Sequence, residues 1–423
     1  RFGAHRASPV EPASLEPTRR ACAVMTIHPR PEPSATTRGP HSIATPIAMA
    51  SVIARDVAAR HAEDVDRRGR FPVETIDALR EAGMLSAAVP ARLGGGGCEL
   101  TELAEICTQL ARECASSGMI YAMHCIQVAS IARHTGEVAE LEDYLRTVVA
   151  EQRLIASVTS EVGTGGDLRS SVTYVDWSES EGTGCFRLEK LTTASSYCEQ
   201  ADDLLLTARR SEDAAQADQV CLLLRRGEFA LSDVGEWDTL GMRGTCSPPA
   251  RVEGQGVAWQ VLPVPFRDIA PATMVPVSHV LWTGVWLGIA SDAYERARRF
   301  LQIKSRKDPD GSVIAANRLA GLATRLASLR GQLAAVIASV EARPPGDAEL
   351  AAEPGAVLAI NDLKLAASEA VVAIINEAIQ VIGIAAYRNE GEWSLGRQLR
   401  DAHSAALMIN NDRIRATNAD LLL

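Results

Sequence analysis

A glycine-rich stretch has the residue types best suited to holding a polar ligand. The run SEVGTGGDLRSS, residues 160–171, combines three glycines with the hydroxyl groups of Ser160, Thr164 and Ser170. Glycine lets backbone amides approach a ligand closely, and hydroxyls both donate and accept hydrogen bonds. The pattern around this run is neither a dinucleotide fingerprint nor a P-loop, so a hairpin turn is the alternative to a binding loop.

A second polar group follows an apolar helical pattern near the end of the sequence. In RDAHSAALMINND, residues 400–412, the apolar positions stop at Asn410, Asn411 and Asp412. We expect one helix that carries these three side chains at its far end. A carboxylate in this position could accept a proton from a ligand, provided that the fold brings it to a binding site.

Composition excludes several classes of protein. The 423 residues are 47% hydrophobic and carry a net charge of −10, which predicts a folded protein of two to three domains that does not bind nucleic acid. The nine cysteines form no metal-ligand spacing, so we expect no metal and reduced thiols in the cytoplasm. No apolar run reaches the ~18 residues that a membrane span needs.

The pattern along the chain predicts an α+β fold that is mainly α. Residues 1–50 are rich in Pro, Ser, Thr and Arg, and we expect a disordered extension there. Helical periodicity predicts an α-helical N-terminal domain over 51–153, and short β-branched runs predict a β-sheet domain over 154–266. From 267 to 423 the pattern indicates a four-helix bundle.

The element boundaries follow from the same patterns. Strands are expected in the runs RLIASVTS, SSVTYVDW, GCFRLEKL, DDLLLTARR, QVCLLLRR and GVAWQVLPV. The bundle helices are expected at 277–307, 312–343, 356–386 and 396–420.

Five motifs in succession resemble those of the acyl-CoA dehydrogenase family. They are FPVETIDALREAGMLSAAVPARLGGGG, SEVGTGGD, LGMRGTCS, AIQVIGIAAYRN and LGRQLRDAHSA, and the resemblance covers about residues 55–423. It implies the same three-domain fold, an FAD cofactor, and a homotetramer or homodimer in which the bundle of one subunit touches a neighbour's cofactor.

The resemblance also assigns cofactor contacts. Thr159, Ser160 and Gly166 match the loop that contacts the flavin ring. Ser195 and Ser196 match the second flavin-contacting segment, where the family commonly has Trp-x-Thr or Trp-x-Ser; the covering tryptophan is absent here.

Two further pairs match the family's contacts to the phosphates of FAD. Lys304 and Arg306 match the region that sends an arginine to the pyrophosphate, for which a guanidinium fork is well suited. Gln380 and Gly383 match a Gln-x-x-Gly-Gly element that approaches a neighbouring subunit's FAD, although its second glycine is Ile384 here.

The general base of the family is missing from its usual position. In the family, a helix-end Glu-Gly-Thr follows the Arg-Asp-Ala element, and its glutamate removes the α-proton of an acyl thioester. Counted without gaps from Arg400, that glutamate falls on Ile409, the glycine on Asn410 and the threonine on Asn411, a candidate cofactor contact. An isoleucine side chain cannot accept a proton.

Three other residues are candidates for the base. His279 lies near the position on the first bundle helix where some family members hold it, and imidazole, with a pKa of ~6.5, is a reasonable base near neutral pH. Asp412 lies three residues beyond Ile409 on roughly the same helix face. His124 is the third, and each of the three could instead be a hydrogen-bonded structural residue.

Two reactions and one inactive alternative follow. The first is an FAD-dependent dehydrogenase that removes the α-proton of an acyl-CoA or acyl-carrier-protein thioester while a β-hydride passes to flavin N5. The second is a flavin-dependent monooxygenase on the same scaffold, which uses O2 and flavin reduced by a partner reductase and needs no glutamate. The third is a scaffold that keeps FAD without catalysis. We expect the dehydrogenase, with an electron acceptor as its partner.

Overall fold

The computed structural model describes residues 45–178, 184–307 and 313–423. Most of the predicted N-terminal extension, as far as residue 44, lies outside these ranges. Its last residues are helical, contrary to the prediction, because α1 already begins at Pro46. Thr45 caps this helix by accepting a hydrogen bond from the Ala48 amide at 3.3 Å, and proline at the first helical position suits a helix start.

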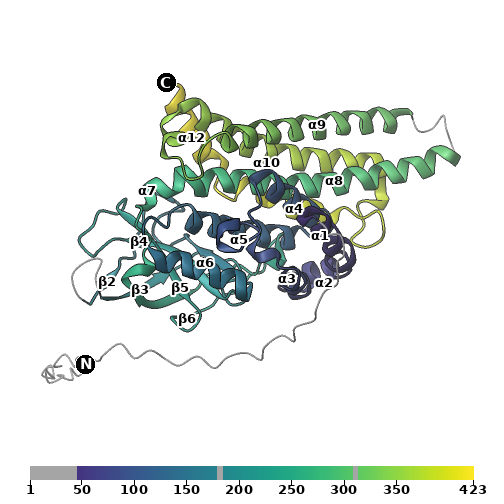
Figure 1. Ribbon diagram of the computed structural model, residues 1–423. Coiled ribbons are helices and arrows are strands. Elements are labelled where there is room, and N and C mark those ends of the chain that lie inside the picture. The colour runs from purple at the N-terminus through teal and green to yellow at the C-terminus, as the bar shows by residue number, and fades with distance from the viewer. Residues whose placement is uncertain (1–44, 179–183, 308–312) are drawn as a thin grey trace, which may run out of the picture. The chain divides into compact units, whose positions relative to one another are not determined.

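The N-terminal helices confirm a helical segment before the sheets (Figure 1). They are α1 Pro46–Ile53, α2 Ala59–Arg68, α3 Val73–Glu81, α4 Leu100–Glu113, α5 Ala115–Ala132 and α6 Ala139–Glu151. Helix α5 is apolar and buried on nearly every side. It therefore forms the centre of the packing rather than a surface layer.

The middle segment forms two small sheets. The first has the order β1-β4-β5, with β1 parallel to β4, and the second has the antiparallel order β2-β3-β7-β6. The strands are β1 Ile155–Val158, β2 Asp176–Trp177, β3 Cys185–Leu191, β4 Asp203–Arg209, β5 Gln219–Arg225, β6 Phe229–Ser232 and β7 Arg251–Val257.

The last predicted strand was placed wrongly. The strand is Arg251–Val257, whereas the predicted run GVAWQVLPV starts at Gly256 and is mostly a 3₁₀ turn and loop. The glycines of β7 concealed it, since glycine usually weakens a strand. Gly254 is required by packing, because a Cβ there would lie 2.3 Å from Leu224 Cδ1.

Three long helices and two short ones form the bundle. They are α8 Val275–Lys307, α9 Val313–Glu341, α10 Pro354–Ile382, α11 Gly396–Ala402 and α12 Asn411–Leu422. The predicted single helix over 396–420 is broken: Ile409 has a left-handed φ of 51°, and Asn410 caps α12. The polar group at 410–412 therefore begins a helix instead of ending one.

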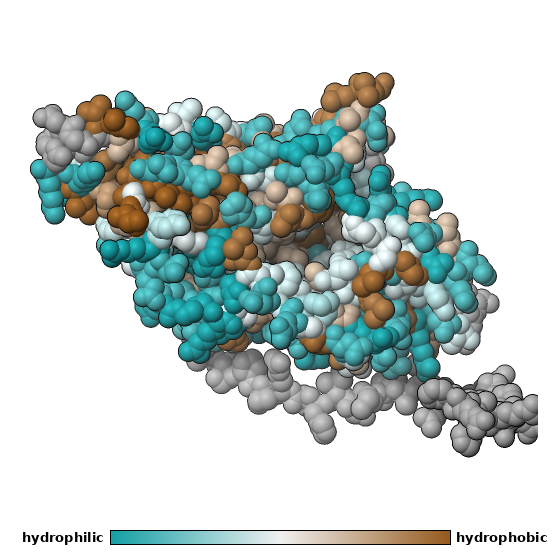
Figure 2. All heavy atoms as spheres, turned by 180° about the vertical axis from the view of Figure 1, so that it is seen from behind, coloured by the Kyte–Doolittle hydropathy of each residue, from teal (hydrophilic) through white to brown (hydrophobic). Residues whose placement is uncertain are grey.

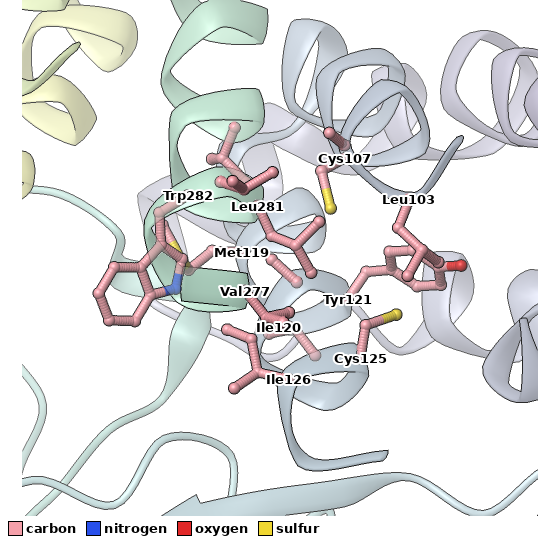
Figure 3. Close-up of a cluster of buried hydrophobic side chains, with 14 of the residues drawn as sticks. Leu103, Cys107, Met119, Ile120, Tyr121, Cys125, Ile126, Val277, Leu281 and Trp282 are labelled. Carbon is pink, nitrogen blue, oxygen red and sulfur yellow. The ribbon is translucent and has the colours of Figure 1, made fainter. Parts of the chain in front are cut away.

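Helices α4, α5 and α8 share one core (Figure 3). Met119 and Ile120 of α5 lie against Val277 and Leu281 of α8, while Trp282 lies at the edge of the cluster with its ring directed away from Tyr121. The first half of α8 is thus fixed between the N-terminal helices and the rest of the bundle.

Two helical stretches, Phe266–Lys307 and Pro354–Ala385, are long and apolar enough to cross a bilayer by composition alone. The core helix of a bundle meets the same criterion. In the first stretch, 94% of the apolar 18-residue segment is buried within the protein. The second is 44% buried. Figure 2 shows hydrophobic residues gathered on the bundle and a hollow below it.

Candidate functional site

The glycine-rich loop leaves the end of β1 and is bound to a second loop. The Ser160 hydroxyl donates to the Ala194 carbonyl at 2.6 Å and accepts from the Ala194 amide at 3.1 Å. Within the described residues, the amides of Ser160 and Gly163 donate to no protein acceptor. Gly166 has a φ of 82° and open space beside it. The loop is therefore fixed at Ser160 by the bonds to Ala194, while backbone amides remain available to donate to a ligand.

The structure brings Ser160, which follows Thr159 beyond the end of β1, against the segment that contains Ser195 and Ser196, but the hydroxyls of both later serines are used within the protein. Ser195 pairs with Thr192, and the Ser196 hydroxyl accepts from Ser247 at 2.8 Å. These side chains stabilise the loop, so its backbone is better placed than its hydroxyls to meet a ligand.

A buried ion pair beneath the loop was not predicted from the sequence. Glu161 accepts from the Ser171 hydroxyl at 2.6 Å and lies 3.5 Å from Lys190, which has no exposed surface. Burial opposes the charge of Glu161, but Lys190 and the hydrogen bonds hold its pKa below the usual value. Burial lowers the pKa of Lys190 to about 8. The only sequence signal was a charge inside the glycine motif.

The C-terminal helix reaches the same loop. The guanidinium of Arg413, in the first turn of α12, donates to the Gly165 carbonyl. The start of α12 therefore contributes to the position of the glycine-rich loop.

The break before α12 is held by α10. The Lys364 ammonium donates to the Ile409 carbonyl at 2.7 Å and to Asn411 Oδ1 at 2.6 Å. Asn411 in turn donates to the Ser368 hydroxyl at 3.0 Å. Its amide is thus occupied by α10, and the ionisable group that binds Ile409 and Asn411 is a cation, not a carboxylate.

His279 lies on the α8 face that packs against α10. Its Nδ1 donates to the Ile360 carbonyl at 3.2 Å, its ring centroid is 6.3 Å from that of Trp282, and Nε2 has no protein partner. Burial lowers its pKa to about 4, and the Lys364 charge acts in the same direction. Accepting a proton would create a second buried cation, so His279 is a poor base for an α-proton.

The other two base candidates lie in structural or exposed positions. His124 Nε2 donates to the Leu85 carbonyl at 2.6 Å, and its Nδ1 accepts from the Ile155 amide at 3.1 Å. Both ring nitrogens are therefore occupied by backbone. Asp412 is exposed and pairs with Arg415 at 2.9 Å. Neither geometry favours a role as general base.

The residues matched to the phosphates lie at the other end of the bundle. Lys304 and Arg306 are exposed on the last turn of α8, and at about 1.5 Å per residue Arg306 is roughly 40 Å from His279 along the helix. Gln380 and Gly383 are exposed at the end of α10. One chain does not bring these four residues to the glycine-rich loop.

A separate hollow of about 820 Å³ lies against the four-stranded sheet. Its lining includes Glu161, Glu189, Phe229 and Glu253. It contains none of the residues predicted to bind the cofactor or to act in catalysis, so we place the candidate site at the junction of β1, α8 and α12.

Comparison with known families decides the classification. The model described as "Acyl-CoA dehydrogenase, N-terminal domain" matches residues 47–152, and "Acyl-CoA dehydrogenase, C-terminal domain" matches residues 276–409. Together they cover more than half of the chain. The chain belongs to the acyl-CoA dehydrogenase family. The fold class and the flavoprotein assignment expected from the sequence are confirmed.

Similar proteins within this family differ in their reactions. The L-evernosamine nitrososynthase of a Micromonospora species is 27% identical over 370 residues, which are 85% of each chain. "Probable FMNH2-dependent monooxygenase SfnC" of Pseudomonas putida is 25% identical over 62% of this chain and 64% of its own.

Solved structures show the same spread. KijD3 in complex with FMN and dTDP-3-amino-2,3,6-trideoxy-4-keto-3-methyl-D-glucose has a TM-score of 0.74 at 24% identity, covering 89% of this chain and 96% of that one. Butyryl-CoA dehydrogenase of Megasphaera elsdenii has a TM-score of 0.74 at 18% identity, covering 89% and 97%. Membership of the family therefore establishes the fold and a flavin cofactor, whereas the reaction depends on the residues of the site.

The site of this acyl-CoA dehydrogenase family member fits a flavin ring. Buried ring nitrogens His279 Nε2 and Trp282 Nε1 have no protein partner among the described residues, and free backbone donors lie in the glycine-rich loop. Unpaired buried polar atoms are costly unless a ligand or water satisfies them. A planar ring with polar edges, such as isoalloxazine, could do so.

Proposed function

We propose that this protein is a flavin-dependent monooxygenase that oxygenates an amine, with reduced flavin and O2 as co-substrates. The observation that carries the proposal is the chemistry of position 409. Where dehydrogenases of the family hold a glutamate, this chain has Ile409, whose carbonyl is bound by the buried Lys364 ammonium. Abstraction of an α-proton needs a general base, which position 409 does not supply, whereas oxygenation by reduced flavin needs none there.

The charge at the break also suits an amine substrate. An amine must be neutral to offer its nitrogen lone pair, and a buried cation disfavours a protonated amine nearby. Lys364, with no exposed surface, supplies that cation. Bound reduced flavin supplies the two electrons: one atom of O2 goes to the amine nitrogen, the other leaves as water, and the flavin is oxidised.

The similar proteins support an amino sugar as the substrate and reduced flavin as the form of the cofactor. The sequence is similar to an amino-sugar nitrososynthase and to a protein named as FMNH2-dependent, and the fold resembles KijD3 bound to FMN and an amino sugar. We therefore propose FMN or FAD delivered in reduced form by a partner reductase, and an amino sugar as the amine.

The acyl thioester dehydrogenase is the second candidate. His279 Nε2 is an unpaired acceptor on α8, and a buried cation near position 409 would also stabilise an enolate. Against it stands the pKa of His279, lowered to about 4 by burial and by Lys364. The His279 imidazole is therefore a weak base for an α-proton.

One pair of reactions separates the candidates. The monooxygenase should consume O2 when given reduced flavin and an amino sugar, and its oxidised flavin should keep its visible absorbance when mixed anaerobically with acyl thioesters. Bleaching by a thioester without amine-dependent O2 uptake would establish the dehydrogenase instead.

We also propose assembly as a homodimer or homotetramer. Two features support it. The apolar 18-residue segment of α10 is less than half buried within one chain, and the residues matched to the phosphates lie at the far end of the bundle. A second copy of the chain would cover the apolar part of α10 and bring the residues matched to the phosphates to its own cofactor.

A further inference from the structure

The Lys364 side chain is a buried cation whose hydrogen bonds go to one short segment. It has no exposed surface and donates to the Ile409 carbonyl and to Asn411 Oδ1, at 2.7 and 2.6 Å. The ring of Trp286 lies 5.9 Å from its nitrogen. Within the described residues, Lys364 has no carboxylate at salt-bridge distance, so neutral acceptors must compensate its burial.

The segment that it holds contains an unfavourable backbone conformation. Ile409 has a φ of 51°, in the left-handed region that β-branched residues rarely adopt. Such a conformation persists where surrounding contacts impose it. The contacts from α10 are the Lys364 bond to the Ile409 carbonyl and the bonds of Lys364 and Ser368 to Asn411.

A continuous set of contacts leads from this segment to the glycine-rich loop. Asn411 is the first residue of α12, and Arg413, two residues later, donates to the Gly165 carbonyl. A shift of residues 409–411 would therefore move the start of α12 and the partner of the loop with it.

We propose that Lys364 is a positioning residue for the flavin site, which holds Ile409 in its left-handed conformation and thereby sets the start of α12 and the glycine-rich loop. This role is independent of which reaction the protein catalyses. It differs from a simple packing role because it acts through the backbone angle at position 409.

Glycine at position 409 provides the test, since glycine adopts a positive φ without steric strain. Lys364→Met should weaken flavin binding about tenfold, the scale of one hydrogen bond from a charged group, measured by fluorescence titration of the full chain. Adding Ile409→Gly should restore most of that affinity, and adding Ile409→Ala should not. Arg325→Met, which removes an exposed cation from α9, is the control.

If Lys364→Met does not fold, Ile409→Gly and Ile409→Ala can be compared in the protein that keeps Lys364. In the otherwise unchanged protein, Ile409→Gly should slow amide exchange across residues 407–412 relative to Ile409→Ala. Wild-type flavin affinity in Lys364→Met, or equal exchange in the glycine and alanine variants, would overturn the proposal. Neither measurement requires turnover, so its failure is distinct from failure of the monooxygenase assignment.

Discussion

The carboxylate of Asp401 accepts a hydrogen bond from the Met242 amide at 2.7 Å, which joins the bundle to the segment before β7. Asp401 is 3% exposed, and Met242 has a left-handed φ of 52°. Two of the motifs that identified the family, LGMRGTCS and LGRQLRDAHSA, therefore meet here, and their residues stabilise the fold around the site.

Substitution of Asp401 should change both stability and its pH dependence. Burial raises the pKa of Asp401 to about 6, so its contribution to stability is largest below the unfolded value near 4 and is lost as pH rises through 6. Asp401→Asn should remove this dependence, and Asp401→Ala should cost about 1–3 kcal/mol at pH 5, where the carboxyl of the folded protein is still protonated, by leaving the Met242 amide unpaired. Denaturant unfolding at several pH values measures both; a parallel pH profile in Asp401→Asn would contradict the assignment.

Gly241 should not tolerate a side chain. A Cβ there would lie 2.1 Å from the Arg400 carbonyl oxygen, a backbone atom that cannot turn aside. Gly241→Ala should therefore lower the melting temperature by several degrees. Gly321→Ala is the matched control, because its Cβ would meet nothing within 4 Å on α9 and alanine favours a helix. Equal melting temperatures for the two variants would count against this packing.

Arg413 should contribute to flavin affinity. Its removal releases the Gly165 carbonyl and frees the glycine-rich loop from α12. We expect Arg413→Ala to weaken flavin binding severalfold, and Arg415→Ala to leave it unchanged, since Arg415 pairs with Asp412 and Glu369 on the surface. Fluorescence titration of both variants checks this, and equal losses would exclude a specific role for Arg413.

The far end of the bundle should distinguish FAD from FMN. Lys304 and Arg306 lie too far from the glycine-rich loop of their own chain to meet the same cofactor. If a second copy brings them to the pyrophosphate, Lys304→Ala with Arg306→Ala should weaken FAD binding and leave FMN binding intact. Calorimetric titration with each flavin decides it, and equal effects on both would exclude a pyrophosphate contact.

The sequence predicted the long, periodic elements best. The apolar faces of α8, α9 and α10 gave their extent to within a few residues, because packing and helical period agree along them. Strand β7 was misplaced because its glycines, which make room for neighbouring side chains, resemble turn residues.

The site was harder to predict than the fold. The break at Ile409 depends on Lys364, 45 positions earlier, and no local pattern marks that contact. His279 was a reasonable base by residue type, but its burial and the nearby cation lower its pKa. The absence of a carboxylate at 409, by contrast, was visible in the sequence, since it needed only a count from Arg400.

Oxygen labelling tests the proposed function most directly. The purified protein is supplied with reduced flavin, an amino sugar and ¹⁸O2, and the mass of the product is measured. Monooxygenation predicts a nitrogen-oxygenated sugar that carries ¹⁸O from O2. An amine recovered unchanged, together with an enoyl thioester formed without O2 from a saturated one, would contradict it.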